Sequence, residues 1–85
     1  MLTMQQIMKR FGCEEFDAME ILVIQEKGVT HGKNDVSFET DEDFEDAVGM
    51  DIEHIETLMM ADTGSVRRVY DAGVKAGRAL RTKAA

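Results

Sequence analysis

Hydrophobic residues recur at helical spacing in several short stretches of this chain. Near its start, four apolar side chains follow at i, i+3, i+4 and i+7, namely Met4, Ile7, Met8 and Phe11. Thr3 and Gln6 have the spacing of a capping box, and Gly12 is a typical residue for ending a helix. The pattern predicts a short amphipathic helix between Thr3 and Gly12.

A second helix is predicted over residues 14–27, followed by Gly28 as its end. Its acidic first turn suits the positive end of the helix dipole. The apolar positions assigned to its buried face are Phe16, Met19, Leu22 and Val23. A strand over residues 20–25 is the competing interpretation, because several β-branched residues fall there, but the length of the segment favours a helix.

Residues 28–40 are the least helical part of the sequence. Turn-forming residues at 32–35 separate Val29 and Thr30 from an alternating segment at 36–40, a pattern compatible with a short β-hairpin near residues 28–40. A plain loop that places Phe38 in the core is the alternative. The sequence leaves both open.

Three more helices are predicted beyond residue 40, with Thr40, Asp51 and Ser65 as their N-caps. The first stops at Gly49 and the second near residues 62–64. The side chains assigned to the buried faces of these two are Phe44, Ala47, Val48, Ile52, Ile55, Leu58 and Met59. One side of the last helix carries Val66, Val69, Tyr70, Gly73, Ala76, Gly77 and Leu80. The predicted fold is mainly α, a single compact domain of four to five short helices over residues 1–85.

Two adjacent methionines, Met59 and Met60, cannot both face one core. We therefore expect Met60 or its neighbour Leu58 to face solvent. An exposed patch at this point, beside Asp62, would suit a partner, although the loop at 63–64 could equally cover it.

Charge divides the chain into three parts whose total is −7. Residues 1–33, a helix-turn-helix-like pair, are close to neutral. Residues 34–62 form an acidic middle with 11 carboxylates and no Lys or Arg, and residues 63–85 form a basic C-terminal helix with 6 basic side chains and 1 acidic. Such asymmetry bears on association with partners rather than on the fold. The basic helix could also simply lie across the acidic middle of its own chain.

The acidic middle suggests the leading function, a non-enzymatic protein–protein interaction module. It would be a phage-type accessory protein that docks on, or inhibits, a nucleic-acid-handling protein with a basic surface. The residues expected to form this acidic face are Asp41, Glu42, Asp43, Glu45, Asp46, Glu53 and Glu56.

The basic helix suggests an alternative, a nucleic-acid-associated oligomeric helical protein. Its candidate anion-binding residues are Arg67, Arg68, Lys75, Arg78 and Arg81, although a solvated face is the plainer interpretation. Its apolar side carries a GxxxG spacing, and two glycines inside a helix imply a close helix neighbour. The residues of this packing or oligomer stripe are Val69, Gly73, Gly77 and Leu80. The sequence does not say whether the stripe packs within the chain or forms a homo-oligomer.

One segment near the start of the chain, residues 10–12 together with residues 16–22, resembles the N-terminal helical unit of phage small terminase subunits. The resemblance implies the same alternative, nucleic-acid association. The second predicted helix, however, presents four carboxylates that would repel phosphate, Glu14, Glu15, Asp17 and Glu20.

Reactive chemistry is sparse, so we expect no catalytic residues, no metal site and no cofactor. Asp41, Asp43 and Glu45 mimic the start of an EF-hand loop, but Asp46 stands where glycine is required. Cys13 has no histidine at zinc-ligand spacing. The single cysteine and the lack of a long apolar run favour a cytoplasmic protein without a membrane span.

Overall fold

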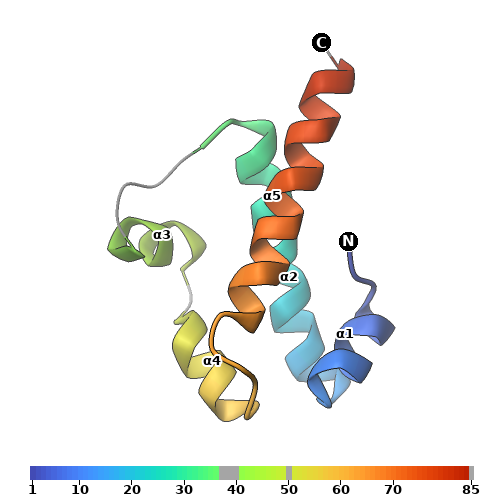
Figure 1. Cartoon of the computed structure of the whole chain (residues 1–85), viewed down its shortest axis with the longest axis vertical. Coiled ribbons are helices and arrows are strands. Elements are labelled where there is room, and N and C mark those ends of the chain that lie inside the picture. The colour runs from blue at the N-terminus through green and yellow to red at the C-terminus, as the bar shows by residue number, and fades with distance from the viewer. Residues whose placement is uncertain (37–40, 50, 85) are drawn as a thin grey trace.

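The computed structural model describes residues 1–36, 41–49 and 51–84, which form five helices and no strand. These are α1 (Met4–Phe11), α2 (Glu15–Lys33), α3 (Asp41–Val48), α4 (Ile52–Leu58) and α5 (Ser65–Ala84). The two long helices α2 and α5 lie side by side, with α1 on one flank of the pair and α3 and α4 on the other (Figure 1). The prediction of a mainly α domain is confirmed.

The predicted start and end of α1 are both confirmed. The Thr3 hydroxyl accepts a hydrogen bond from the Gln6 N–H (3.2 Å), and the Gln6 side chain accepts one from the Thr3 N–H (2.9 Å). Gly12 ends the helix at φ 61°, a left-handed conformation that glycine adopts without a Cβ penalty. Ile7 is fully buried and anchors α1 on Ala18 and Ile21 of α2.

The predicted end of the second helix at Gly28 is wrong, because α2 continues to Lys33. The hairpin interpretation therefore fails for residues 28–33, which are helical. Residues 37–40, including Phe38 and the predicted Thr40 cap, lie outside the described residues. A mid-helix glycine costs about 1 kcal/mol relative to alanine, and tight packing of Gly28 on α5 compensates for it.

The buried face of α2 also differs from the prediction. Phe16, Met19 and Val23 are 75%, 50% and 39% exposed, and Leu22 is only half-buried. The face that packs on α1 and α5 instead carries Ala18, Ile21, Ile24, Gln25, Gly28 and Gly32. The glycines decide the orientation, because the side of α2 that bears them is the side that α5 can approach closely.

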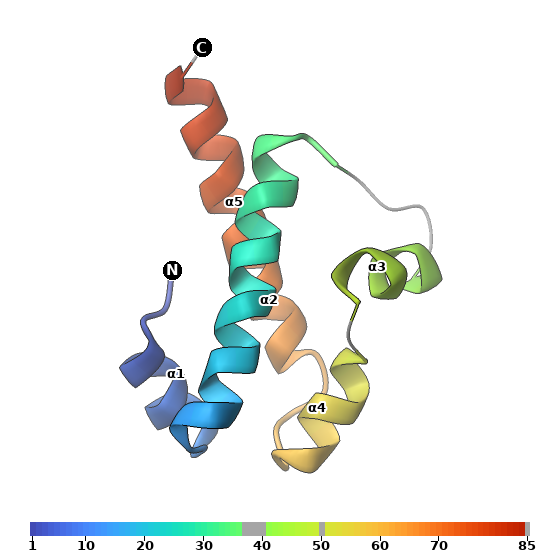
Figure 2. The same ribbon diagram turned by 180° about the vertical axis from the view of Figure 1, so that it is seen from behind.

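Four glycines form the contact between α2 and α5, which run past each other in both views (Figures 1 and 2). A Cβ placed on Gly28 or Gly32 would lie within 3.0 Å of backbone atoms of α5, and one on Gly73 or Gly77 would lie equally close to backbone of α2. The close approach predicted for Gly73 and Gly77 is thus present within the chain.

The two short helices close over one end of this pair. Phe44 and Val48 of α3 and Ile52 and Ile55 of α4 are buried in a cluster that reaches Ile24, Val66 and Tyr70. Ala47, which was assigned to the core, is exposed. The Asp51 cap of α4 is confirmed by a hydrogen bond from the His54 N–H to its carboxylate (3.0 Å). Helix α4 ends at Leu58, earlier than predicted.

Candidate functional site

Most of the predicted acidic face is exposed on α3 and α4. The described side chains that reach solvent are Glu42, Asp43, Glu45, Asp46 and Glu53. The side chain of Asp41 lies outside the description. Glu45 and Asp46 share a shallow hollow with Asp51, where the two helices meet. These carboxylates belong to α3 and α4, and both helices lie on one flank of the α2–α5 pair (Figure 2).

Glu56 departs from this group, because it is only 4% exposed. Its carboxylate accepts hydrogen bonds from the Val66 N–H (2.8 Å) and the Ser65 hydroxyl (3.3 Å). A side chain from α4 thus caps the first turn of α5, a task that the sequence assigned to Ser65. Glu56 therefore joins α4 to α5 and is not part of the exposed acidic face.

Helix α5 makes most of its contacts with α2, and only its first turns meet the acidic helices, where Arg67 shares a hollow with Glu45 and Glu53. Among the described residues, its ion pairs include Arg67 with Asp71 (3.4 Å) and Arg81 with Asp35 (3.3 Å). Of these four residues, only Asp35 belongs to the acidic middle. An ion pair as exposed as Arg81–Asp35 contributes little to stability. Neither pair involves a carboxylate of α3 or α4.

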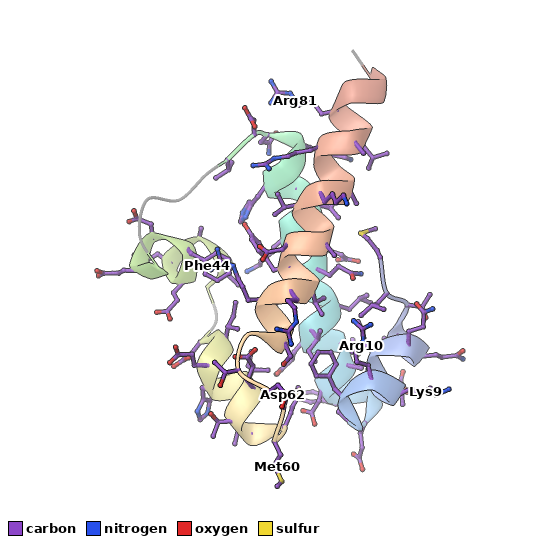
Figure 3. The ribbon with its side chains drawn as sticks, viewed as in Figure 1. Lys9, Arg10, Phe44, Met60, Asp62 and Arg81 are labelled. Carbon is purple, nitrogen blue, oxygen red and sulfur yellow. The ribbon has the colours of Figure 1, made fainter. Side chains whose placement is uncertain are left out.

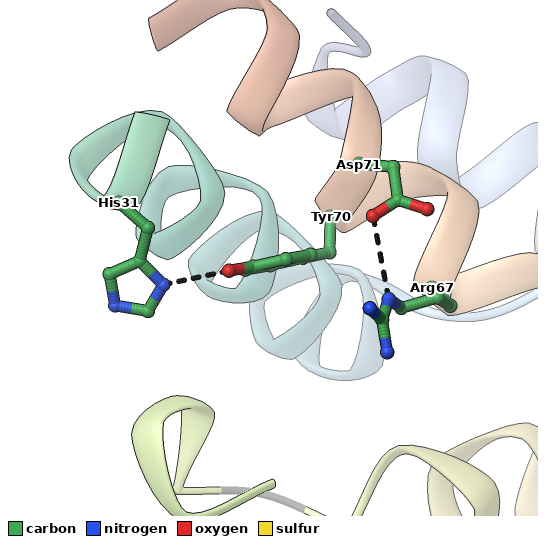
Figure 4. A network of polar contacts seen from close by, with 4 residues as sticks. All are labelled: His31, Arg67, Tyr70 and Asp71. Atoms are coloured by element: carbon green, nitrogen blue, oxygen red, sulfur yellow. Dashed lines mark hydrogen bonds and ion pairs between the residues drawn. The ribbon is translucent and has the colours of Figure 1, made fainter. Parts of the chain in front are cut away.

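Arg67 is engaged in packing rather than held ready for an anion. Its guanidinium stacks over the Phe44 ring at 3.7 Å from the centroid, which joins α3 to α5. Tyr70, which also belongs to α5, is hydrogen-bonded through its hydroxyl to His31 Nδ1 (2.8 Å) (Figure 4). Burial raises the pKa of the Tyr70 phenol, while the nearby Arg67 charge opposes the shift.

The other basic candidates, Arg68, Lys75 and Arg78, are exposed along α5. The four residues of the packing stripe on α5 differ in burial. Val69, Gly73 and Gly77 are buried against α2, whereas Leu80 is 45% exposed. The buried part of the stripe is therefore used within the chain and is not available for joining subunits.

A groove that the sequence did not predict lies between the α1–α2 turn and the end of α4. It has a volume of about 260 Å³, and its lining residues are Phe11, Gly12, Cys13, Glu14, Asp17, Glu20, Ile55, Leu58, Met59 and Met60. Met60 is 94% exposed, which confirms the outward orientation expected at this point. Leu58 is 70% exposed, so its assignment to the buried face is wrong, because α4 ends at this residue. Met60 points away from the body of the molecule at the opposite end from Arg81 (Figure 3).

The rim of this groove is acidic. Glu14, Asp17 and Glu20 line it, and no Lys, Arg or His does. Burial raises the pKa of the Cys13 thiol in the same groove, and the Asp17 carboxylate raises it further. The sequence showed these carboxylates only as a favourable first turn of a helix. Their position beside Met59 and Met60 depends on how α4 packs.

In the part of the chain that is described, no three side chains of His, Cys, Asp or Glu come together in a way that could hold a metal ion. None of its helices combines the length and apolar character needed to cross a bilayer.

Comparisons with known proteins give no further information about this site. No family model, no curated protein and no solved structure matches the chain. The resemblance of residues 10–22 to small terminase subunits gains no support from them. The surface chemistry is therefore the basis for a functional proposal.

Proposed function

We propose that this protein is a non-enzymatic interaction module that docks, through the exposed carboxylates of α3 and α4, on a basic surface of a larger protein. A phage-type accessory protein that inhibits or modulates a nucleic-acid-handling protein fits this description. The observation that carries the proposal is the exposure of Glu42, Glu45, Asp46 and Glu53 on α3 and α4. The ion pairs Arg67–Asp71 and Arg81–Asp35 involve none of these carboxylates. The free thiol of Cys13 suits the cytoplasm.

The physical basis is electrostatic complementarity. Proteins that bind nucleic acid present basic grooves to phosphate, and carboxylates on a compact module can occupy the same grooves. Exposed surface charge of one sign raises the rate of encounter with an oppositely charged surface. It also makes that rate sensitive to salt, because exposed charges are screened over about 10 Å at 0.1 M ionic strength.

The test is a variant in which four exposed carboxylates of α3 and α4 are neutralised. The substitutions are Glu42→Gln, Glu45→Gln, Asp46→Asn and Glu53→Gln. A control variant removes the same number of exposed charges from other elements. Its substitutions are Glu15→Gln, Asp35→Asn, Asp62→Asn and Asp71→Asn.

Both variants and the native protein serve as baits for affinity capture from a native lysate of the source cells, followed by mass spectrometry. We expect the native protein and the control to capture a partner with a basic surface that the α3–α4 variant loses. With the purified partner, the association rate should fall about tenfold for the α3–α4 variant and depend less steeply on salt. Equal capture and equal association rates for the two variants would contradict the proposal.

A further inference from the structure

We propose that the module is anchored by an apolar surface on α2 and α4, and that the occupant of this surface is a basic amphipathic helix of the partner. This inference rests on the proposed function and names the site that supplies affinity. The anchoring surface is formed by Phe16, Met19, Val23, Leu58 and Met60.

The first argument is exposure. Phe16, Met19 and Val23 follow at i, i+3 and i+7, so they lie on one face of α2, opposite the glycines that pack on α5. Glu20, four residues after Phe16 and three before Val23, lies beside both on the helix surface and lines the groove together with Leu58 and Met60. The helix face and the groove are therefore neighbours, and together they leave five large apolar side chains in contact with water. Apolar surface of this kind marks an interaction site.

The second argument is charge. Three carboxylates, Glu14, Asp17 and Glu20, line the groove, and residues 14–26 contain no basic side chain. An apolar surface with an acidic rim is complementary to an apolar stripe flanked by Lys or Arg. Flexible methionine side chains, such as Met19 and Met60, adapt well to such a stripe.

The third argument concerns the other occupants. A groove of about 260 Å³ falls below the range of about 300–1,000 Å³ typical of small-molecule sites. From Phe16 to Val23 the exposed stripe extends about 10 Å along α2, which suits a packed helix. A second copy of this chain, joined symmetrically at the surface, would place one acidic rim against another, and like charges in contact oppose association.

The probe is a synthetic helical peptide of about 18 residues, or five turns, with Leu on one face and Lys on the other. A peptide of equal charge with Ser in place of Leu reports attraction by charge alone. Methyl groups of the methionines provide separate NMR signals across the protein. We expect the Leu–Lys peptide to shift the signals of Met19, Met59 and Met60 and to leave those of Met4 and Met8 unchanged. Shifts spread equally over all of them, or none at the first three, would overturn the inference.

Affinity gives the second readout. Leu58→Ser with Met60→Ser, and separately Phe16→Ser with Met19→Ser, should each weaken the Kd for the Leu–Lys peptide about tenfold, chiefly through faster dissociation. Leu80→Ser, an exposed apolar position on α5, is the matched control and should leave the Kd unchanged. The four residues of the double variants are at least half exposed and Leu80 is 45% exposed, so the fold tolerates the changes.

The two proposals fail in different ways. Equal binding of the Leu–Lys and Ser–Lys peptides, or an unchanged Kd in both double variants, would overturn the anchoring surface. That result would leave the capture experiment with the α3–α4 variant unaffected. Sedimentation of the native protein as a dimer that both double variants dissociate would assign the surface to a second copy and would also overturn the inference.

Discussion

Replacing Gly32 by alanine perturbs the contact on which the fold depends most. A Cβ at this position would meet the backbone carbonyl oxygen of Val74 and would lie 3.0 Å from the Arg78 backbone nitrogen. Both are main-chain atoms of α5, so no side-chain rotation can make room. The helices α2 and α5 must move apart instead, and the neighbouring glycine contacts at Gly28, Gly73 and Gly77 would be loosened together.

Two opposing contributions set the magnitude. Alanine is favoured over glycine inside a helix by about 1 kcal/mol, which stabilises the variant. Overpacking against rigid neighbours costs about 1–3 kcal/mol, and a site enclosed by backbone belongs at the upper end. We therefore expect a net destabilisation of about 2 kcal/mol. For a domain of this size, that corresponds to a fall in Tm of about 8–16 °C.

Thermal and urea unfolding, followed by circular dichroism, measure this change. Ala72→Gly, at an exposed position of α5, is the control and should cost about 1 kcal/mol through helix propensity alone. The sign of the effect is decisive, because propensity by itself predicts that Gly32→Ala stabilises the protein. A Gly32→Ala variant as stable as the native chain, or more so, would refute the close packing of α2 on α5.

Three other predictions follow from side chains at defined positions. Glu56→Ala removes the acceptor of the buried Val66 N–H, so urea denaturation should show a loss of about 1–3 kcal/mol, and an unchanged midpoint would contradict the capping role. Burial raises the pKa of Tyr70 above the value of 10.0 that it has when unfolded. The stability this group contributes is thus complete below pH 10.0 and declines as the pH rises further, a decline that Tyr70→Phe should abolish in alkaline unfolding curves. Burial and the Asp17 carboxylate likewise raise the pKa of the Cys13 thiol above 9.0. Alkylation of Cys13 by iodoacetamide at neutral pH should therefore be slower than that of a cysteine in an unfolded peptide. Equal alkylation rates would argue against the raised pKa.

Several features of this protein were determined by the sequence alone. The capping box at Thr3, the left-handed Gly12 and the Asp51 cap involve residues within four positions of one another, so local chemistry is sufficient to specify them. The uneven charge is a property of composition and needed no structure. Glycine at 73 and 77 likewise implied a close helix neighbour, because such residues otherwise weaken a helix.

Tertiary structure decided the identity of that neighbour. Once Gly28 and Gly32 face Gly73 and Gly77, helix α2 passes through a glycine that would end an isolated helix. The same contact turns Phe16 outward, although its spacing is typical of a core position. The packing of α4 on α5 makes Glu56 a cap of α5. The packing of α4 beside the α1–α2 turn places Met60 at the acidic groove. Local pattern predicts where a helix can form, but which of its faces is buried depends on the free energy of contacts between residues far apart in the chain.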